Sequence, residues 1–248
     1  MITAGCSYSQ VPNRDTAWPA PLNEHLNPET VLYLGQGAAG NGIISRKVIY
    51  NTTEMLKKYK PEEILVGIMW SGCDRGETYS LNPINTTIIE YGVANYRNPM
   101  SVIGNNNKHY YLTNGCWDDD RSQNAKKYMI PEDRVLNTLE HILRTQWFLK
   151  LHNISYFMTE YDYDCFTTYC AKDLNLTQKG KDLKFLWDQI DWEYWLPINN
   201  CLEWVTLKSG FKHARPGDDH PSTEQHRALV ERIILPFLLE KKLINDTI

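Results

Sequence analysis

Five short apolar runs divide this chain into segments, and each run is bounded by polar or turn-forming residues. Continuous apolar runs of this kind are typical of strands that are buried on both faces of a parallel sheet. The strands predicted in this way are residues 1–4, 31–34, 64–70, 154–158 and 202–207.

Between these runs, apolar residues recur every three or four positions, which predicts helices that bury one side. The last helix has the clearest start, because Ser222 can cap it and Gln225, three residues later, completes a capping box. The first helix carries prolines near its start, where a missing N–H is tolerated. The predicted helices are residues 15–26, 43–59, 131–152 and a final helix that begins after Ser222.

Strands that alternate with helices indicate an α/β fold with a parallel sheet. We predict one domain over residues 1–248, a three-layer α/β/α sandwich whose mainly parallel sheet has five strands in flavodoxin-like order. Two stretches, about 76–130 and 161–200, lack a sustained period and are predicted to be irregular insertions. The first contains Asp118–Asp120, for which a solvated acidic turn is favoured over a cation site because no regular ligand spacing follows.

Composition narrows the class of protein. A hydrophobic content of 42% and a charged content of 23% are typical of a chain that buries its own core. The net charge of -4, without a long basic run, argues against nucleic acid as the main partner. No apolar run reaches the length of a membrane span and no signal peptide precedes the first strand, so we expect cytoplasmic synthesis and no membrane partner. The six cysteines form no CxxC pair and are expected to be free thiols.

Residues with catalytic potential gather near the two ends of the chain. Gly5-Cys6-Ser7-Tyr8-Ser9 follows the first predicted strand, and a serine there would lie at the carboxyl edge of the sheet, where α/β folds bind ligands. Asp218-Asp219-His220-Pro221-Ser222 precedes the last helix and would add a base and an orienting acid. The residues alone leave other roles open. Ser7 could be a helix cap, His220 a turn residue, and Cys6 a nucleophile or sensor. Residues 218–220 could instead form a metal site.

Four blocks in this order resemble the SGNH (GDSL-like) hydrolase family, especially divergent members from phage genomes. The blocks are residues 5–9, 37–41, 70–75 and 218–222. The resemblance implies a Ser-His-Asp serine esterase with Ser7 as nucleophile, His220 as base and Asp218 as acid. Asp219 is the alternative acid; Asp218 is preferred because a two-residue offset can be absorbed by a bulged turn, whereas an adjacent aspartate would have to point back along the chain.

The family's oxyanion hole implies backbone N–H groups from Ser7 and Gly40. The usual asparagine of the third block is absent here, and either Ser71 or Asn41 would replace its hydrogen bond. The predicted substrate-binding residues are Arg75 and Tyr8, and neither a cofactor nor a metal is implied.

The resemblance implies ester hydrolysis, with the removal of O-acetyl groups from a carbohydrate as the favoured reaction. The expected partner is an acylated glycan or another small ester, and association with a virion or with further copies of the chain stays open. The first alternative is a non-catalytic virion or surface protein that binds glycans on the same fold. It is favoured by the missing third-block asparagine and by the two insertions. The second is a metal-dependent hydrolase that uses the acidic clusters.

Overall fold

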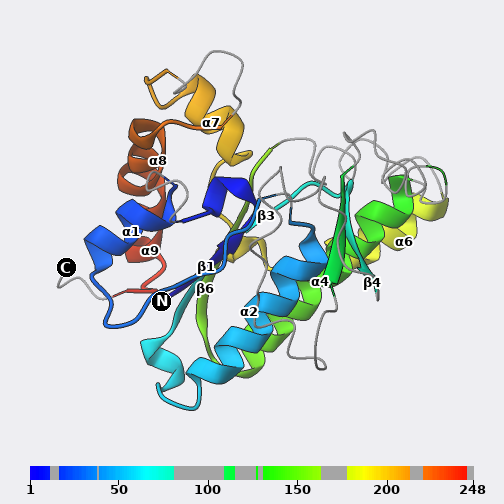
Figure 1. Ribbon diagram of the computed structural model, residues 1–248, viewed down its shortest axis with the longest axis horizontal. Helices are drawn as coiled ribbons and strands as arrows, with labels where there is room; N and C mark the ends of the chain where they lie inside the picture. The colour runs from blue at the N-terminus through cyan, green and yellow to red at the C-terminus, as the bar shows by residue number, and fades with distance from the viewer. Residues whose placement is uncertain are drawn as a thin grey trace.

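A computed structural model of the protein describes residues 1–11, 17–37, 39–80, 109–114, 127, 131–162, 178–212 and 220–244. Within them, a parallel sheet of four strands forms the centre of the molecule, in the order β2-β1-β3-β6 (Figure 1). β1 pairs with both β2 and β3, and β3 pairs with β6. These strands confirm the first four predicted from apolar runs. Their bounds are β1 (Ile2–Gly5), β2 (Leu32–Tyr33), β3 (Leu65–Trp70) and β6 (Ser155–Glu160).

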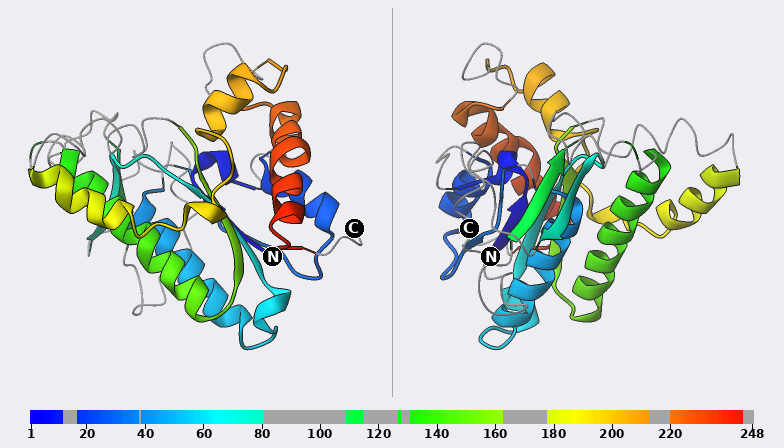
Figure 2. Two further views of the ribbon diagram at one scale, coloured as in Figure 1. Left: turned by 180° about the vertical axis from the view of Figure 1, so that it is seen from behind. Right: turned by 45° about the vertical axis from the view of Figure 1, so that its right-hand side comes forward.

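Helices lie against both faces of this sheet (Figures 1 and 2). α1, α8 and α9 cover one face, and α2 and α4 cover the other, as the two core clusters also show. A mixed α/β fold with helices on both sides of a parallel sheet is therefore confirmed. The helices are α1 (Pro19–Leu26), α2 (Asn41–Met55), α4 (Pro131–Leu151), α6 (Gln178–Trp187), α7 (Cys201–Leu207), α8 (Thr223–Leu229) and α9 (Leu235–Glu240).

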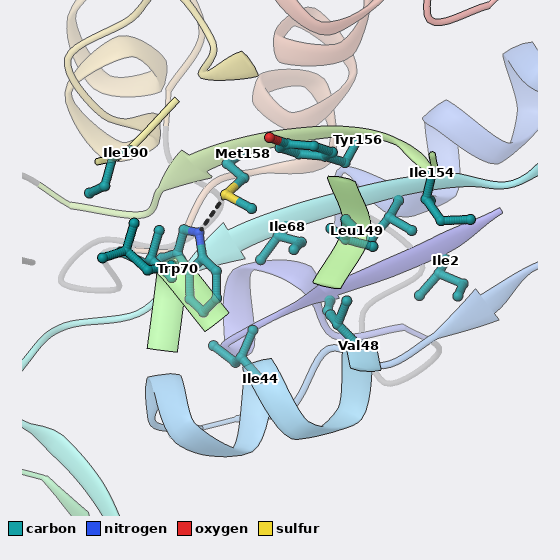
Figure 3. Close-up of a cluster of buried hydrophobic side chains, with 14 of the residues drawn as sticks. Ile2, Ile44, Val48, Ile68, Trp70, Leu149, Ile154, Tyr156, Met158 and Ile190 are labelled. Atoms are coloured by element: carbon teal, nitrogen blue, oxygen red, sulfur yellow. Dashed lines mark hydrogen bonds between the residues drawn. The ribbon is translucent and has the colours of Figure 1, made fainter. Parts of the chain in front are cut away.

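Strand β3 explains why the predicted strands are apolar throughout. Its side chains alternate between the two faces, as in any strand. Val66, Ile68 and Trp70 join the core cluster beneath α2 and α4, part of which Figure 3 shows. Leu65 and Met69 join the cluster beneath α1, α8 and α9. Both faces of the strand are thus buried, so neither set of alternate positions tolerates polar side chains.

The fifth predicted strand, residues 202–207, is wrong, because this segment forms helix α7. Asn200 caps the helix by accepting a hydrogen bond from the Glu203 N–H, and the buried residues Cys201, Trp204 and Val205 have helical spacing. A run of six residues is too short for periodicity to separate a strand from a helix. Beyond β6, a single parallel bridge joins Met158 to Trp195 instead.

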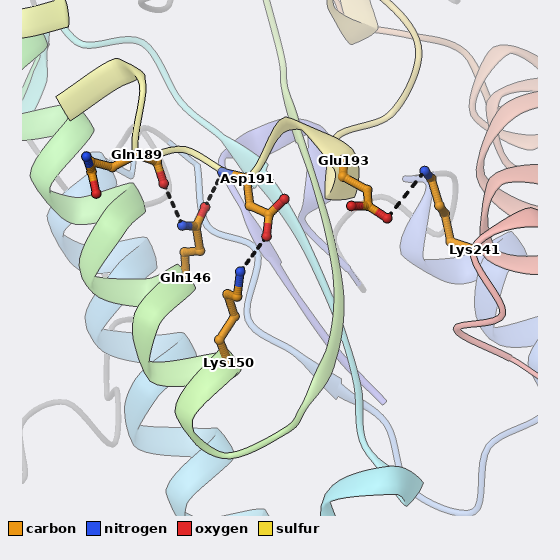
Figure 4. Close-up of polar contacts among 6 residues, drawn as sticks. All are labelled: Gln146, Lys150, Gln189, Asp191, Glu193 and Lys241. Carbon is orange, nitrogen blue, oxygen red and sulfur yellow. Dashed lines mark hydrogen bonds and ion pairs between the residues drawn. The ribbon is translucent and has the colours of Figure 1, made fainter. Parts of the chain in front are cut away.

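Polar contacts hold the segment between α6 and α7 across the edge of the sheet (Figure 4). Gln146 in α4 donates to the Gln189 carbonyl and accepts from the Asp191 N–H. Asp191 also pairs with Lys150 of α4 at 2.6 Å, and Glu193 lies 3.9 Å from Lys241 beyond α9. This segment covers the outer edge of β6, which would otherwise expose unpaired backbone groups.

The two insertions contain regular structure that the sequence did not predict. β4 (Arg75–Ser80) and β5 (His109–Asn114) form a two-stranded antiparallel sheet. Helix α6 and the 3-10 helix η6 (Trp192–Tyr194) lie in the second insertion. The prediction of irregular structure is therefore wrong for residues 76–80, 109–114, 178–187 and 192–194, none of which forms a continuous apolar run. Residues 118–120 lie outside the described part of the chain.

The final predicted helix is continuous but changes geometry along its length. α8 passes into a π-helical segment, Val230–Ile234, and then into α9. Pro236 stands in the first turn of α9 and has no N–H to donate, so the regular hydrogen-bond pattern cannot pass through it. Within the residues that the structure describes, no helix combines the length and apolar character needed to cross a bilayer.

Candidate active site

Ser7 and His220 meet at the carboxyl edge of the sheet. Ser7 opens the 3-10 helix η1 (Ser7–Ser9), which follows β1 directly, and His220 lies just before Ser222, the N-cap of α8. Ser7 Oγ and His220 Nε2 are 2.8 Å apart, which is hydrogen-bond distance. Both residues are half-buried. The two ends of the chain therefore come together where the order of the blocks places them.

Helix η1 separates the roles of its two serines. A 3-10 helix has three residues per turn, so consecutive side chains point about 120° apart. Ser7 faces His220, whereas the Ser9 hydroxyl is buried and accepts a hydrogen bond of 2.8 Å from Trp18 Nε1. Gly5 permits this tight turn, because a Cβ there would lie 2.3 Å from Ser9 Oγ and 2.7 Å from the Met69 carbonyl oxygen. Only Ser7 is left to reach both solvent and a base.

The start of α8 fixes the backbone next to His220. The predicted capping box is confirmed: the Ser222 N–H donates to Gln225 Oε1, and the Gln225 N–H donates to Ser222 Oγ. The fully buried Gln225 amide also donates to the carbonyls of Val205 at 2.8 Å and Phe211 at 3.1 Å. The turn that carries His220 is thus joined to the end of α7.

Tyr8, predicted to bind substrate, is buried against the histidine. Its ring centroid lies 5.0 Å from that of His220 and 5.2 Å from that of Tyr161, which it meets edge-on. Burial raises the pKa of the Tyr8 phenol far above its ordinary value, so its hydroxyl stays protonated. Tyr161, which directly follows β6, was missed in the sequence, although its place at the end of a strand would have located it at this edge.

Hydrogen bonds connect the first and second loops of the site. The Gln36 N–H donates to the Gly5 carbonyl and the Gly37 N–H donates to Gln10 Oε1, both at 2.9 Å. Gly40 is the N-cap of α2, and N–H groups at the start of a helix have no intrahelical acceptor. The second loop therefore stands beside Ser7 with a helix N-terminus at its end. Gln10 is a further residue that the sequence did not single out.

Asn41 joins the second loop to the third. Its side chain donates to the Ser71 carbonyl at 2.9 Å and to Thr138 Oγ1 at 3.1 Å, and it accepts from the Ser71 N–H at 2.8 Å. Both of its N–H groups are thus used inside the protein, and the side chain is 2% exposed. Ser71 is also buried, and its hydroxyl accepts from Arg75 Nη1 at 3.1 Å. Of the two candidates for the third oxyanion donor, Asn41 has no N–H group left to donate, and the Ser71 hydroxyl is buried and used as an acceptor.

Arg75 connects the third loop to the aromatic side of the site. Besides its bond to Ser71, Nη2 donates to the Tyr161 hydroxyl at 3.2 Å, and the guanidinium lies 4.8 Å from the centre of the Tyr161 ring. Arg75 is half-buried, at the beginning of β4. The candidate acids Asp218 and Asp219 lie outside the described residues.

The described thiols are buried, and the described carboxylates form no metal cluster. Cys6, the alternative nucleophile, has no exposed surface, and burial raises the pKa of the Cys201 thiol. Cys6, Cys73 and Cys201 are free thiols. Among the described residues, no three His, Cys, Asp or Glu side chains are grouped so that they could hold a metal ion.

Lys47 of α2 forms hydrogen bonds to the residues that lead into the second loop. Its ammonium donates to Gln36 Oε1 and, at 3.3 Å, to the Leu34 carbonyl. The side chain is 6% exposed, and burial lowers its pKa to about 8. No pattern in the sequence indicated this role, because a lysine on an amphipathic helix is ordinarily solvated.

We expect Lys47 to make stability depend on pH in the alkaline range. Between pH 8 and 10.5 the unfolded chain keeps the lysine proton that the folded protein has lost. The free energy of unfolding of the wild type should therefore rise with pH, by up to about 1.4 kcal/mol per pH unit, relative to Lys47→Met. Urea denaturation of both proteins at pH 7.5 to 10 measures the difference, in which all other titrating groups cancel. If the free energy of unfolding changed with pH in the same way in both proteins, the lowered pKa of Lys47 would be contradicted.

No protein-family model, curated protein or solved structure matches this chain. The geometry of the Ser7 and His220 site is therefore the basis for assigning a function.

Proposed function

We propose that this protein is a serine hydrolase of the SGNH (GDSL-like) type, which cleaves esters through an acyl intermediate on Ser7. The observation that supports this proposal is the 2.8 Å contact between Ser7 Oγ and His220 Nε2. A serine hydroxyl is a weak nucleophile at neutral pH, and an imidazole nitrogen at this distance can take its proton as the hydroxyl attacks. Of the two serines in the first block, Ser7 alone combines this contact with access to solvent.

The proposed reaction has two steps. Ser7 Oγ attacks the ester carbonyl while His220 accepts its proton, and His220 then returns that proton to the leaving alcohol. A water molecule, deprotonated by His220, then attacks the acyl carbon and releases the carboxylic acid, while His220 returns the proton to Ser7 Oγ. The N–H groups of Ser7 and Gly40 would stabilise the negative oxygen, because both stand at helix starts without an intrahelical acceptor. Asp218, or Asp219 in its place, would orient the imidazole.

The proposed fold is a shortened flavodoxin-like sandwich. The order β2-β1-β3-β6 corresponds to the first four positions of the flavodoxin-like order, and the bridge from Met158 to Trp195 lies at the fifth. Folds of this order bind ligands at the carboxyl ends of their strands. Ser7, Ser71 and Tyr161 follow β1, β3 and β6 at that edge.

For the substrate we propose an O-acetylated carbohydrate. The support is the family resemblance together with the polar and aromatic edge formed by Arg75 and Tyr161. The alternative, a glycan-binding protein without catalysis on a virion or cell surface, is favoured by one observation about the third oxyanion donor. Asn41 uses both of its side-chain N–H groups within the protein, and Ser71 has no exposed surface.

Covalent labelling separates these two functions. A fluorophosphonate should react with the wild type and leave its adduct on the peptide that contains Ser7, whereas Ser7→Ala and heat-unfolded wild type should not react. In parallel, the wild type should release acetate from a chromogenic acetyl ester and from an acetylated oligosaccharide faster than Ser7→Ala does. Equal turnover by both proteins and no adduct, together with saturable binding of the oligosaccharide, would instead favour the binding protein.

A further inference from the structure

Tyr8 packs against the His220 ring at the place where the imidazole meets Ser7. The planes of the two rings are tilted by 38° with their centroids 5.0 Å apart. Tyr8 also meets Tyr161, with the ring planes at an angle of 61°. Only 4% of Tyr8 is exposed, which leaves little of its surface for a substrate.

Packing of this kind restricts the rotation of the His220 ring about its second side-chain torsion, which decides where Nε2 points. The hydrogen bond to Ser7 holds the Nε2 edge of the ring, but the second side-chain torsion of histidine has a broad energy minimum. A rigid aromatic ring against the imidazole narrows that minimum. It also places π electrons beside a ring that becomes positively charged when it accepts a proton.

Tyr161, which contacts Tyr8, is itself fixed by two hydrogen bonds. The Tyr161 N–H donates to the Trp70 carbonyl at 3.1 Å, which continues the pairing of β3 with β6. The Tyr161 hydroxyl accepts from Arg75 Nη2 at 3.2 Å. Tyr8 is thus in contact with both the histidine and a side chain that is attached to the sheet and to the third loop.

We propose that Tyr8 is a positioning residue for His220: its ring keeps Nε2 directed at Ser7 Oγ and stabilises the imidazolium that forms as the serine attacks. This inference rests on the proposed function and replaces the substrate-binding role that the sequence suggested for Tyr8. The ring carries the effect, and the phenol oxygen is not required.

Two variants test the role of the ring by kinetics. Tyr8→Leu, which keeps an apolar side chain without π electrons, should lower kcat for the chromogenic ester by about tenfold and leave KM within about twofold. Tyr8→Phe should restore most of the lost kcat. A rise in KM at constant kcat in Tyr8→Leu would show contact with the substrate and overturn the inference. Equal losses in the Phe and Leu variants would overturn it as well.

Imidazole ¹⁵N spectra test the same inference without any turnover. In the wild type and in Tyr8→Phe, His220 should show two separate ring-nitrogen signals, as expected of one fixed tautomer, and His220→Gln assigns them. In Tyr8→Leu these signals should move toward each other, because an imidazole that loses its fixed hydrogen bond to Ser7 exchanges between its two tautomers. If Tyr8→Leu fails to fold, Tyr8→Met, which can fill the space flexibly, takes its place. Unchanged His220 signals in a folded Leu or Met variant would overturn the positioning role, whereas inactivity of the wild type would overturn only the proposed function.

Discussion

Ser7→Ala and His220→Gln are each expected to lower kcat/KM for an acetyl ester by about 1,000-fold or more. The expectation follows from the hydrogen bond of 2.8 Å that joins the two side chains. Without His220 the serine hydroxyl keeps its proton, and without Ser7 the imidazole has no nucleophile to activate. Because the two groups act on the same proton, kcat/KM of the double variant should be no lower than that of the less active single variant.

Steady-state kinetics on the three variants measures this coupling. The matched control is His152→Gln, which removes an imidazole that packs against Phe148 beyond the end of α4, with ring centroids 4.6 Å apart. That control should keep the wild-type rate. Strictly additive losses in the double variant would show that Ser7 and His220 act independently and would contradict the proposed mechanism. A His220→Gln enzyme with more than about a tenth of the wild-type rate would do the same.

Asn41→Leu is expected to lower the free energy of unfolding by about 3 kcal/mol or more. Leucine has a similar size but can neither donate nor accept, so the buried N–H and carbonyl of Ser71 and the hydroxyl of Thr138 lose their partner. Each buried polar group without a partner costs about 1–3 kcal/mol. Activity should fall as well, because Asn41 joins the second loop, which carries Gly40, to the third.

Urea unfolding measures the stability change, and Asn51→Ala is the control in the same helix. Asn51 is half-buried and makes one side-chain bond, to the Lys47 carbonyl, at 2.8 Å. Its loss should cost less than about 1 kcal/mol, because the Lys47 carbonyl still accepts its regular backbone hydrogen bond within α2. An Asn41→Leu protein as stable as the control would show that the buried amide contributes little to joining the loops.

The sequence by itself determined the elements whose signal is local. The apolar runs predicted β1, β2, β3 and β6 because strands buried on both faces of a parallel sheet are apolar at every position. The periodic segments predicted α2 and α4, and the pair Ser222 and Gln225 located the start of α8, because a capping box needs only residues three apart. The order of the blocks, with the carboxyl ends of parallel strands at one edge, also predicted that Ser7 and His220 would meet.

Only the tertiary structure decided the features that depend on distant partners. Cys201–Leu207 became a helix whose residues Cys201, Trp204 and Val205 join the core cluster beneath α1, α8 and α9, although the run is too short for its period to be recognised. Ser9 has a different role from Ser7 because its hydroxyl accepts a hydrogen bond from Trp18. The Asn41 amide donates its hydrogen bonds to Ser71 and Thr138 instead of to a substrate. Tyr8 is buried and packs against His220. None of these outcomes is encoded in neighbouring residues, because each is set by which polar or aromatic group the folded chain brings within contact distance.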